Sequence, residues 1–444
     1  MRSTVRILPY CPIFSPCPTG TVPILLILQM FIRIFFIKLT IETKGQKSSP
    51  LYSPTMPTGK LENNLSTNSA AAAALVACED LMLCVLSRLP VISICRFRSV
   101  CKSWNHLLST QEFIKMQFKL SSGYKNRSFL VHRVDKNERH TISVYNFESN
   151  EKNFVHPFIH TRIDIVGCCR GLVCIRRGKG FVFWNPAMNL SKTVSPLQDH
   201  HGDDFKVSLG FGYDAEGDDF KVVRILLKDK IGLNHRIWRM CVSCVEVYSV
   251  NSDSWTTIDP GFGFQFNNVP KRSDATVNGN PYWVVKVDGN DVLICFDMSK
   301  FIFKIVPLST LDYEKVKPVD VEFVDLNGSL GAFVFTWCNG LVNVWVFDNV
   351  EQVWTKSHSV KMNRNLRCLK YWRVLGLRML PKGQLIVFNS ETKFVKDLFN
   401  FVHDFEIYVY TPSLAYIQGM EKVTLRKCRL SQCVSRCFHL WCLD

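Results

Sequence analysis

Residues 128 to about 420 consist mainly of short runs of Val, Ile, Phe, Tyr and Trp, separated by Gly, Asn, Asp and Pro. Such runs are typical of short antiparallel strands, because β-branched and aromatic side chains suit a half-buried pleated surface. One arrangement recurs, in which an apolar strand, a polar turn and a second short strand follow one another. It occurs at 142–157, 181–196, 245–260, 293–308, 342–357 and 407–419. This pattern predicts an all-β region.

The recurring units follow one another at intervals of about forty to sixty residues, near the repeat length of propeller blades. We therefore expect each unit to form the outer hairpin of one blade, with a pair of packed β-sheets as the alternative. Segments that start with a glycine turn are expected to supply inner strands. These segments are CRGLVCI, VNGNPYWVV, CNGLVNVWV and PKGQLIVF.

Residues 79–118 follow helical periodicity instead. Apolar side chains recur there at three- and four-residue steps, and Pro90 ends the first helix. Three or four short helices within about forty residues are too few to bury these side chains among themselves. A partner or the following domain is expected to complete the burial, so the segment is either an interaction module or a helical cap.

The run EDLMLCVLSRLPVISICRFRSVCKSWNHLLSTQEF at 79–113 resembles a plant F-box. The resemblance implies that an apolar face of residues 77–118 binds the Skp-type linker subunit of a cullin ubiquitin ligase. Carried over by position, the contact or scaffold residues are Leu81, Val85, Leu86, Leu89, Pro90, Val91, Ile94, Phe97, Val100, Cys101 and Trp104.

One departure from the F-box pattern concerns the start of this segment. Family members usually begin with Leu-Pro, whereas this chain has Ala77-Cys78. Losing these apolar contacts is expected to weaken linker binding by about 1–3 kcal/mol.

The β region at 125–420 is similar to the F-box-associated, kelch-related domain. The resemblance rests on CRGLVCI, FVFWNPAMN, LGFGYDAEGDDFKVVRI, VEVYSVNSDSW and VNGNPYW. The paired glycines of kelch blades are absent from it. The expected fold is thus α+β multidomain, with a small helical F-box module before a mainly antiparallel, propeller-like domain. The resemblance implies that loops on one face recruit the protein to be ubiquitinated, and it assigns no substrate-binding residue.

Charge and cysteine usage bear on partners and compartment. Of the formal net charge of +16, nine charges lie in residues 1–60 and in the basic, Cys-rich tail 421–444. This distribution leaves no strong basic stripe, so nucleic acid is not an expected partner. The 18 cysteines are scattered, many within apolar runs. Buried free thiols in the cytoplasm or nucleus explain them better than a disulfide framework does.

The N-terminal extension 1–55 contains an apolar run at 21–41, which Arg33 and Lys38 interrupt. A weak membrane anchor is one interpretation. We favour the other, in which Met56 is the start of the working protein and 56–76 is a polar linker, so that a membrane is not an expected partner.

Several short patterns superficially suggest chemistry. Gly210 and Gly212 resemble part of a phosphate-binding glycine loop, but the third glycine and the following helix of such a loop are missing. We therefore expect them to be turn glycines. Asp214, Asp218 and Asp219 lack the terminal glutamate of a calcium-binding loop, so we expect a solvated hairpin loop there. Cys241 and Cys244 have the spacing of metal ligands, but no second cysteine pair lies at the distance that a zinc ribbon requires. The tail is either a zinc site or an unstructured or docked segment, and its candidate ligands are Cys428, Cys433, Cys437, His439 and Cys442.

No catalytic residue, metal site or cofactor is assigned, and the chain is not expected to be an enzyme. The favoured function is a ligase adaptor that binds the linker subunit, through it a cullin, and an unidentified protein substrate. A propeller that binds proteins outside any ligase is the second hypothesis. An enzyme built on a propeller is the third.

Overall fold

The computed structural model describes residues 82–121, 128–134, 138, 140–146, 152–158, 162–178, 180–194, 205–231, 238–266, 270–311, 321–326, 328–336, 341–361, 366–369, 374–379, 384–389, 395–400 and 405–423. Every described residue belongs to one compact unit, which spans residues 75–444. Short helices open this unit, and antiparallel sheets follow.

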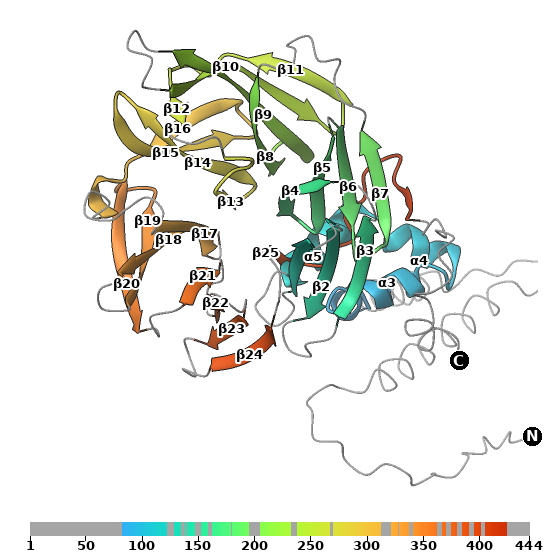
Figure 1. The fold of residues 1–444 in the computed structure, drawn as a ribbon. Coiled ribbons are helices and arrows are strands. Elements are labelled where there is room, and N and C mark those ends of the chain that lie inside the picture. The colour runs from blue at the N-terminus through green and yellow to red at the C-terminus, as the bar shows by residue number, and fades with distance from the viewer. Residues whose placement is uncertain are drawn as a thin grey trace, which may run out of the picture. The chain divides into compact units, whose positions relative to one another are not determined.

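Antiparallel strands form five sheets, and the largest consists of two four-stranded units joined through β12 (Gln265–Phe266). The described residues therefore contain six four-stranded units, which Figure 1 shows around a common axis. This arrangement is a six-bladed propeller, so the predicted propeller-like fold is confirmed and the pair of packed sheets is wrong.

The first three blades, each from its innermost strand outward, are as follows. Blade 1 contains β25 (Phe405–Tyr410), β1 (Ser128–Val134), β2 (His140–Asn146) and β3 (Lys152–Phe158). Blade 2 contains β4 (Ile163–Cys169), β5 (Leu172–Arg177), β6 (Gly180–Asn185) and β7 (Leu190–Val194). Blade 3 contains β8 (Lys206–Asp214), β9 (Asp219–Ile231), β10 (Trp238–Ser249) and β11 (Ser254–Ile258).

The other three blades follow the same order. Blade 4 contains β13 (Ala275–Val277), β14 (Asn280–Val287), β15 (Asn290–Asp297) and β16 (Ile302–Val306), after which a 3₁₀ turn, η2, spans Ser309–Leu311. Blade 5 contains β17 (Val321–Leu326), β18 (Ser329–Thr336), β19 (Leu341–Asp348) and β20 (Val353–Lys361). Blade 6 contains β21 (Leu366–Leu369), β22 (Val374–Met379), β23 (Gln384–Asn389) and β24 (Val395–Asn400).

The apolar cores lie between neighbouring blades. Four clusters of buried side chains fill the spaces between blades 1 and 2, 2 and 3, 3 and 4, and 4 and 5. Trp184, Phe183, Trp283 and Phe323 are among the largest side chains, one from each of these clusters. Because blades 2, 3 and 4 each bury both faces, their strands can carry apolar residues in nearly continuous runs, as β6 does.

The ring is closed by a strand from the C-terminal end of the propeller. β25 pairs with β1 from Ser128↔Tyr410 to Arg133↔Phe405, so blade 1 contains both ends of the propeller sequence. Residues 411–420 then run along blade 2, where Asn185 Nδ2 donates to the carbonyl oxygens of Ser413 (3.1 Å) and Ala415 (2.8 Å). The segment ends as β26 (Glu421–Lys422), a fifth strand paired with β7.

The hairpin turns repeat one geometry in blades 2 to 5. Four residues separate the paired positions, and the last of the four has a positive φ although it is not glycine. The pairs are Asn185↔Leu190, Asp214↔Asp219, Ser249↔Ser254, Asp297↔Ile302 and Asp348↔Val353. In each of these five turns the first side chain accepts a hydrogen bond from the backbone N–H three residues later.

The structure corrects two expectations about the hairpins. Five of the six predicted hairpins correspond to strand pairs, but 407–419 does not, because β25 is followed by a non-strand segment and pairs with β1. The sixth blade is formed by 366–400 instead. The segments that start with glycine turns also supply second or third strands, namely β5, β14, β19 and β23, and not inner ones.

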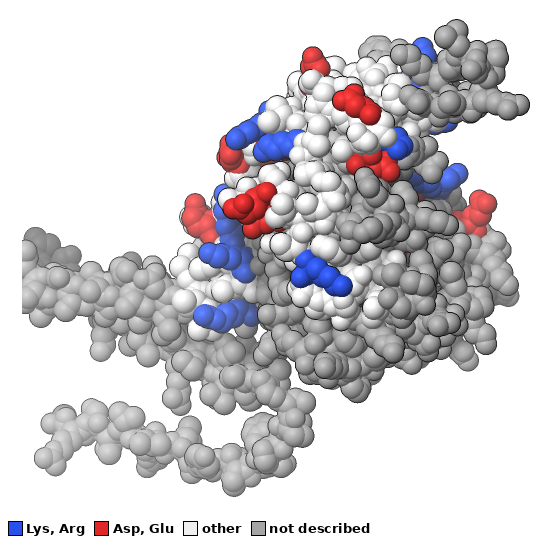
Figure 2. Space-filling model, turned by 90° about the vertical axis from the view of Figure 1, so that its left-hand side faces the viewer, with Lys and Arg blue, Asp and Glu red and all other residues white. Residues whose placement is uncertain are grey.

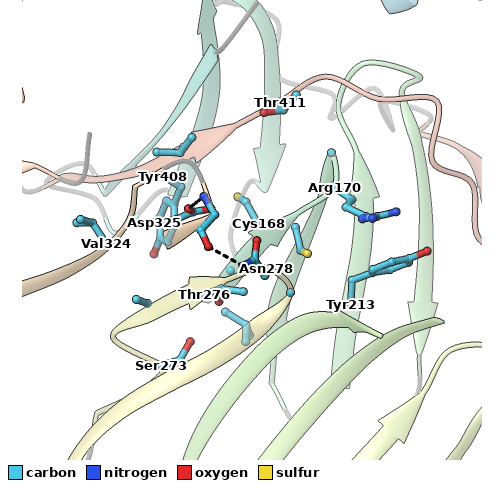
Figure 3. Close-up of a pocket in the computed structure, with 18 of the residues that line it drawn as sticks. Cys168, Arg170, Tyr213, Ser273, Thr276, Asn278, Val324, Asp325, Tyr408 and Thr411 are labelled. Atoms are coloured by element: carbon cyan, nitrogen blue, oxygen red, sulfur yellow. Dashed lines mark hydrogen bonds between the residues drawn. The ribbon is translucent and has the colours of Figure 1, made fainter. Parts of the chain in front are cut away.

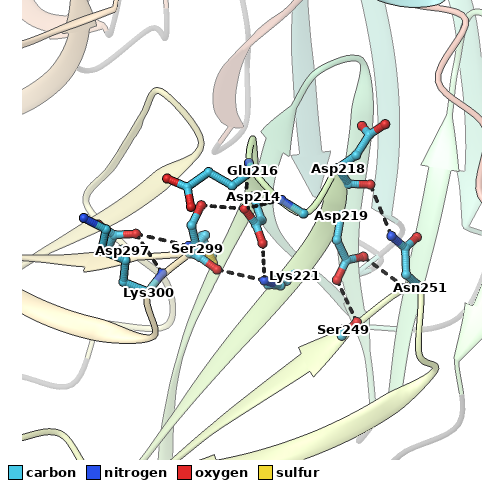
Figure 4. Close-up of polar contacts among 12 residues, drawn as sticks. Asp214, Glu216, Asp218, Asp219, Lys221, Ser249, Asn251, Asp297, Ser299 and Lys300 are labelled. Carbon is cyan, nitrogen blue, oxygen red and sulfur yellow. Dashed lines mark hydrogen bonds and ion pairs between the residues drawn. The ribbon is translucent and has the colours of Figure 1, made fainter. Parts of the chain in front are cut away.

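Residues 209–219 also differ from their prediction. Gly210 and Gly212 lie inside β8 and not in a turn. Residues 215–217 of their hairpin are exposed, as expected of a solvated turn, but Asp214 and Asp219 themselves are only 5% and 4% exposed. Asp214 binds Lys221 and the Ser299 hydroxyl of blade 4, and Asp219 accepts hydrogen bonds from Ser249 and Asn251 (Figure 4).

In the described part of the chain, the propeller is preceded by helices α3 (Val91–Phe97), α4 (Lys102–Leu107) and α5 (Gln111–Ser121). Residues 82–86 form a further short helical turn. Pro90 caps α3 with an extended backbone, as its fixed φ favours at a helix start. The predicted succession of short helices in this segment is thus present.

Candidate functional site

The first candidate site is the helical module. Leu86, Val91 and Ile94 are 0–3% exposed, so these three predicted residues support the module from inside. Val85, Leu89, Phe97, Cys101 and Trp104 are half-buried, and Pro90 is exposed. The Phe97 and Trp104 rings pack edge to face at 5.6 Å. Leu81 lies outside the described residues, as do Ala77 and Cys78.

Solvent-exposed apolar side chains remain on this module. Val100 is 55% exposed. Ile92 is 42% exposed, although the F-box resemblance did not single it out. The turn that carries Val100 is fixed by Arg98, whose guanidinium Nε and Nη2 donate to the Leu108 carbonyl oxygen at 3.2 and 2.6 Å. Burial lowers the pKa of Arg98. We name Pro90, Ile92 and Val100 the exposed apolar set.

Helix α5 attaches the module to the propeller. Lys115 Nζ lies 2.9 Å from Asp218 Oδ2, and the other Asp218 oxygen accepts a hydrogen bond from the Tyr213 hydroxyl. Burial alone would raise the pKa of Asp218, but the hydrogen bonds from Tyr213 and Lys115 lower it. The Arg170 guanidinium lies over the rings of Tyr213 (3.9 Å) and Phe118 (5.5 Å).

The second candidate site is a cavity of about 860 Å³ at the end of the propeller channel next to α5. Inner strands β4, β8, β13, β17 and β25 supply most of its walls, and Phe118 and Lys119 of α5 complete its rim. Figure 3 shows Cys168, Thr276, Asn278 and Tyr408 around its centre. A ligand in this cavity would therefore touch both the helical module and several blades.

A short segment, 271–273, crosses the inner edge of blade 3 and joins it to blades 1 and 2. It pairs with Leu209 of β8 through hydrogen bonds on both sides. Lys271 Nζ lies 3.0 Å from Asp164 of β4, and Arg272 Nη1 lies 2.9 Å from Glu406 Oε1 of β25. These two ion pairs link the segment between blades 3 and 4 to inner strands of blades 2 and 1.

Glu406 is the centre of this polar cluster. Its Oε2 accepts from the Tyr408 hydroxyl at 2.9 Å and lies 3.2 Å from His132 Nδ1. Burial alone would raise the pKa of Glu406, but His132, Arg272 and Tyr408 hold it at about 2. The carboxylate therefore stays ionised at any physiological pH.

The depressed pKa of Glu406 predicts a pH dependence of stability. Its contribution is complete above the ordinary value of 4.5 and is lost as pH falls through about 2. The variant Glu406→Gln lacks this contribution at every pH. Between pH 4.5 and 2, the thermal midpoint of the variant should therefore fall less than the thermal midpoint of the unchanged protein. Thermal unfolding followed by circular dichroism would measure both, and parallel curves would contradict the assignment.

The described residues contain no group of three or more His, Cys, Asp or Glu side chains that could hold a metal ion. Cys241 and Cys244 lie on β10, where the pairing with β9 shifts register between Val242 and Cys244. The tail cysteines and the apolar run 21–41 lie outside the described residues. No described helix has the length and apolar character needed to span a membrane.

On the face shown in Figure 2, basic and acidic side chains are interspersed over the described part of the surface. The candidate sites therefore remain the exposed apolar set and the channel cavity. The F-box resemblance had singled out Pro90 and Val100 of the first site, but not Ile92. Sequence reasoning missed Arg170, although CRGLVCI contains this residue, because the side chains that meet it come from distant segments.

Comparison with known proteins adds family relationships. A model of the F-box-associated beta propeller domain matches residues 151–442, and a model of the F-box domain matches 78–116. An F-box protein of Arabidopsis thaliana is 27% identical over 229 residues, which are 48% of this chain and 55% of the relative. An F-box/kelch-repeat protein of the same plant is 26% identical over 309 residues, 63% of this chain and 78% of the relative.

Some of these relatives are thus matched over only about half their length. Among solved structures, TolB from Acinetobacter baumannii is 9% identical with a TM-score of 0.38 and covers 68% of this chain and 70% of its own. The family match spans well over half of the sequence and includes five of the six blades in full. This chain belongs to the F-box-associated β-propeller family, with an F-box domain before the propeller.

Proposed function

We propose that this chain is the substrate-recognition adaptor of an SCF-type cullin ubiquitin ligase. The observation that carries the proposal is the exposed apolar set, Pro90, Ile92 and Val100, which lies within the residues that match the F-box domain. Exposed apolar side chains on a small helical module lose contact with water when a partner covers them. The partner in this proposal is the Skp-type linker subunit, and through it a cullin.

The propeller is the second half of the proposal. It holds a protein substrate while the F-box domain holds the ligase, so the two bound proteins experience a high effective concentration of each other. The contacts Lys115–Asp218 and Phe118–Arg170 support this role, because they couple α5 to the blades. Catalysis belongs to other subunits in this proposal, and the protein works in the cytoplasm or nucleus.

Val100→Asp tests the linker interaction in the full-length chain. The carboxylate would be buried without a partner in the complex, so we expect at least a tenfold loss of affinity for a purified Skp-type linker subunit, or about 1.4 kcal/mol or more. Because Val100 is 55% exposed, the thermal midpoint should stay unchanged. Titration calorimetry would measure the affinity.

Val350→Asp is the matched control. Val350 is 86% exposed on the β19–β20 turn of blade 5, so this change should leave linker binding unchanged. Equal affinity of Val100→Asp and the unchanged protein would contradict the assigned face. Leu86→Asp is unsuitable, since Leu86 is fully buried and the change would unfold the module.

A second candidate function is a protein-binding propeller that joins no ligase, and the observation that favours it is Ala77-Cys78 in place of Leu-Pro. In that case the unchanged protein would not bind the linker subunit. Ala77→Leu together with Cys78→Pro would then restore binding, whereas failure to restore it would also count against the F-box face itself.

A further inference from the structure

Arg170 occupies a backbone conformation that does not favour arginine. Arg170 and Gly171 form the two-residue turn between β4 and β5, with φ values of 45° and 80°. Among the described residues, two other turns have positive φ at both central positions, Asn278-Gly279 and Asp288-Gly289. Asn and Asp tolerate positive φ, whereas a long side chain gains nothing from it. The arginine is therefore present for its side chain.

The Arg170 side chain is held in place by aromatic rings. Its guanidinium lies over the Tyr213 and Phe118 rings, and Figure 3 shows Arg170 and Tyr213 side by side at one edge of the cavity. Within the described ranges no acceptor bonds to its N–H groups. The nearby Asp218 carboxylate is already bound by Lys115 through one oxygen and by Tyr213 through the other.

Stacking of this kind leaves the in-plane N–H groups of a guanidinium available. Those groups match two oxygens of a carboxylate or phosphate in a bidentate pair. The backbone is also fixed here, since the Ser413 hydroxyl donates to the Arg170 carbonyl oxygen at 2.6 Å. A cation oriented in advance at a cavity rim loses little freedom when it binds an anion.

We infer that Arg170 is the anion-recognition residue of the channel cavity, and that it binds a carboxylate or phosphate group on an extended segment of the recruited protein. The inference rests on the proposed function for the nature of that partner. Because Phe118 of α5 lines the same cavity, the bound segment would lie beside the F-box domain and not at the far end of the channel.

Arg170→Asn is the decisive variant, because it removes the guanidinium and installs the residue that the matching turn carries at Asn278. It should fold at least as well as the unchanged protein. Arg177→Asn is the matched control: it removes the same charge from an exposed position at the other end of β5.

Two fluorescent probes distinguish the anion sources: a hexaglutamate peptide, and a neutral peptide with one phosphoserine. Fluorescence anisotropy of the full-length chain should show about tenfold weaker binding of at least one probe in Arg170→Asn, and less than twofold weakening in Arg177→Asn. The probe that loses affinity identifies the source as carboxylate or phosphate.

Equal losses of probe affinity in both variants would show that only the overall charge matters, and would overturn the inference. The inference would also be overturned if Arg170→Asn lost no affinity, or if neither probe bound the unchanged protein. Linker affinity is measured on the same samples. If the linker fails to bind while probe binding depends on Arg170, the adaptor proposal fails and the anion site stands.

Discussion

Gly212→Ala is expected to destabilise the propeller by about 3 kcal/mol or more, which is a large effect for one methyl group. A Cβ at this position would lie 1.9 Å from the Gly279 carbonyl oxygen, a backbone atom of blade 4. That oxygen accepts the Tyr213 N–H at 3.0 Å, so it cannot withdraw without breaking the hydrogen bond between blades 3 and 4. Gly279 itself, at φ 83°, is fixed in a tight turn.

Chemical denaturation of the full-length chain, followed by tryptophan fluorescence, would measure this loss. Gly263→Ala is the matched control, because a Cβ there meets no atom within 4 Å and its φ is not positive. The control should be neutral or slightly stabilising, since alanine reduces the freedom of the unfolded chain. If the two variants unfold at the same denaturant concentration, the close approach of β8 to the β13–β14 turn is wrong.

The role of Gly212 could not be read from the sequence, although the strand that contains it could. Composition and alternation identified the all-β region because these signals are local to each strand. The reason for a glycine in the middle of β8 is a contact with residue 279, which is distant in sequence. The same limitation explains 407–419: β25 reads as half of a hairpin, but its pairing partner is β1, at the other end of the propeller.

The F-box residues show a related limit. Periodicity places Leu86, Ile94 and Val100 in one apolar series, yet the first two are fully buried and the third is 55% exposed. Spacing reports that a side chain avoids water and does not report which surface covers it. Arg170 left a weak local signal, because it precedes a glycine where Asn278 and Asp288 do, but its significance needs the cavity and the two aromatic rings.

Lys221→Met should destabilise the protein by about 3 kcal/mol, because it leaves a buried carboxylate without its cation. The Lys221 and Asp214 side chains are 7% and 6% exposed, and their Nζ and Oδ2 atoms lie 2.5 Å apart. Lys221 also donates to the Met298 carbonyl oxygen at 2.9 Å, so the pair links blade 3 to blade 4 (Figure 4). Urea unfolding at pH 7 would measure the loss.

Lys304→Met is the matched control, since Lys304 pairs with Asp297 at 2.7 Å beside a turn of the same four-residue type, between β15 and β16, but is 52% exposed. It should cost less than about 1 kcal/mol. Similar costs for the two lysines would contradict the role given to burial. Adding Asp214→Asn to Lys221→Met should recover part of the loss, because the unpaired charge is then gone.

The pH dependence of the same variants separates charge from packing. Burial alone would raise the pKa of Asp214, but hydrogen bonds from the Gly217 amide, Lys221 and Ser299 hold it at about 2. The stability that this carboxylate contributes is complete above its ordinary pKa of 3.8 and is lost as pH falls through about 2. The deficit of Lys221→Met should therefore shrink over that interval, because protonation of Asp214 removes the charge that the lysine compensates. A deficit that stays constant down to pH 2 would mean that Lys221 acts through its packing against Phe301, over whose ring its Nζ lies at 4.4 Å.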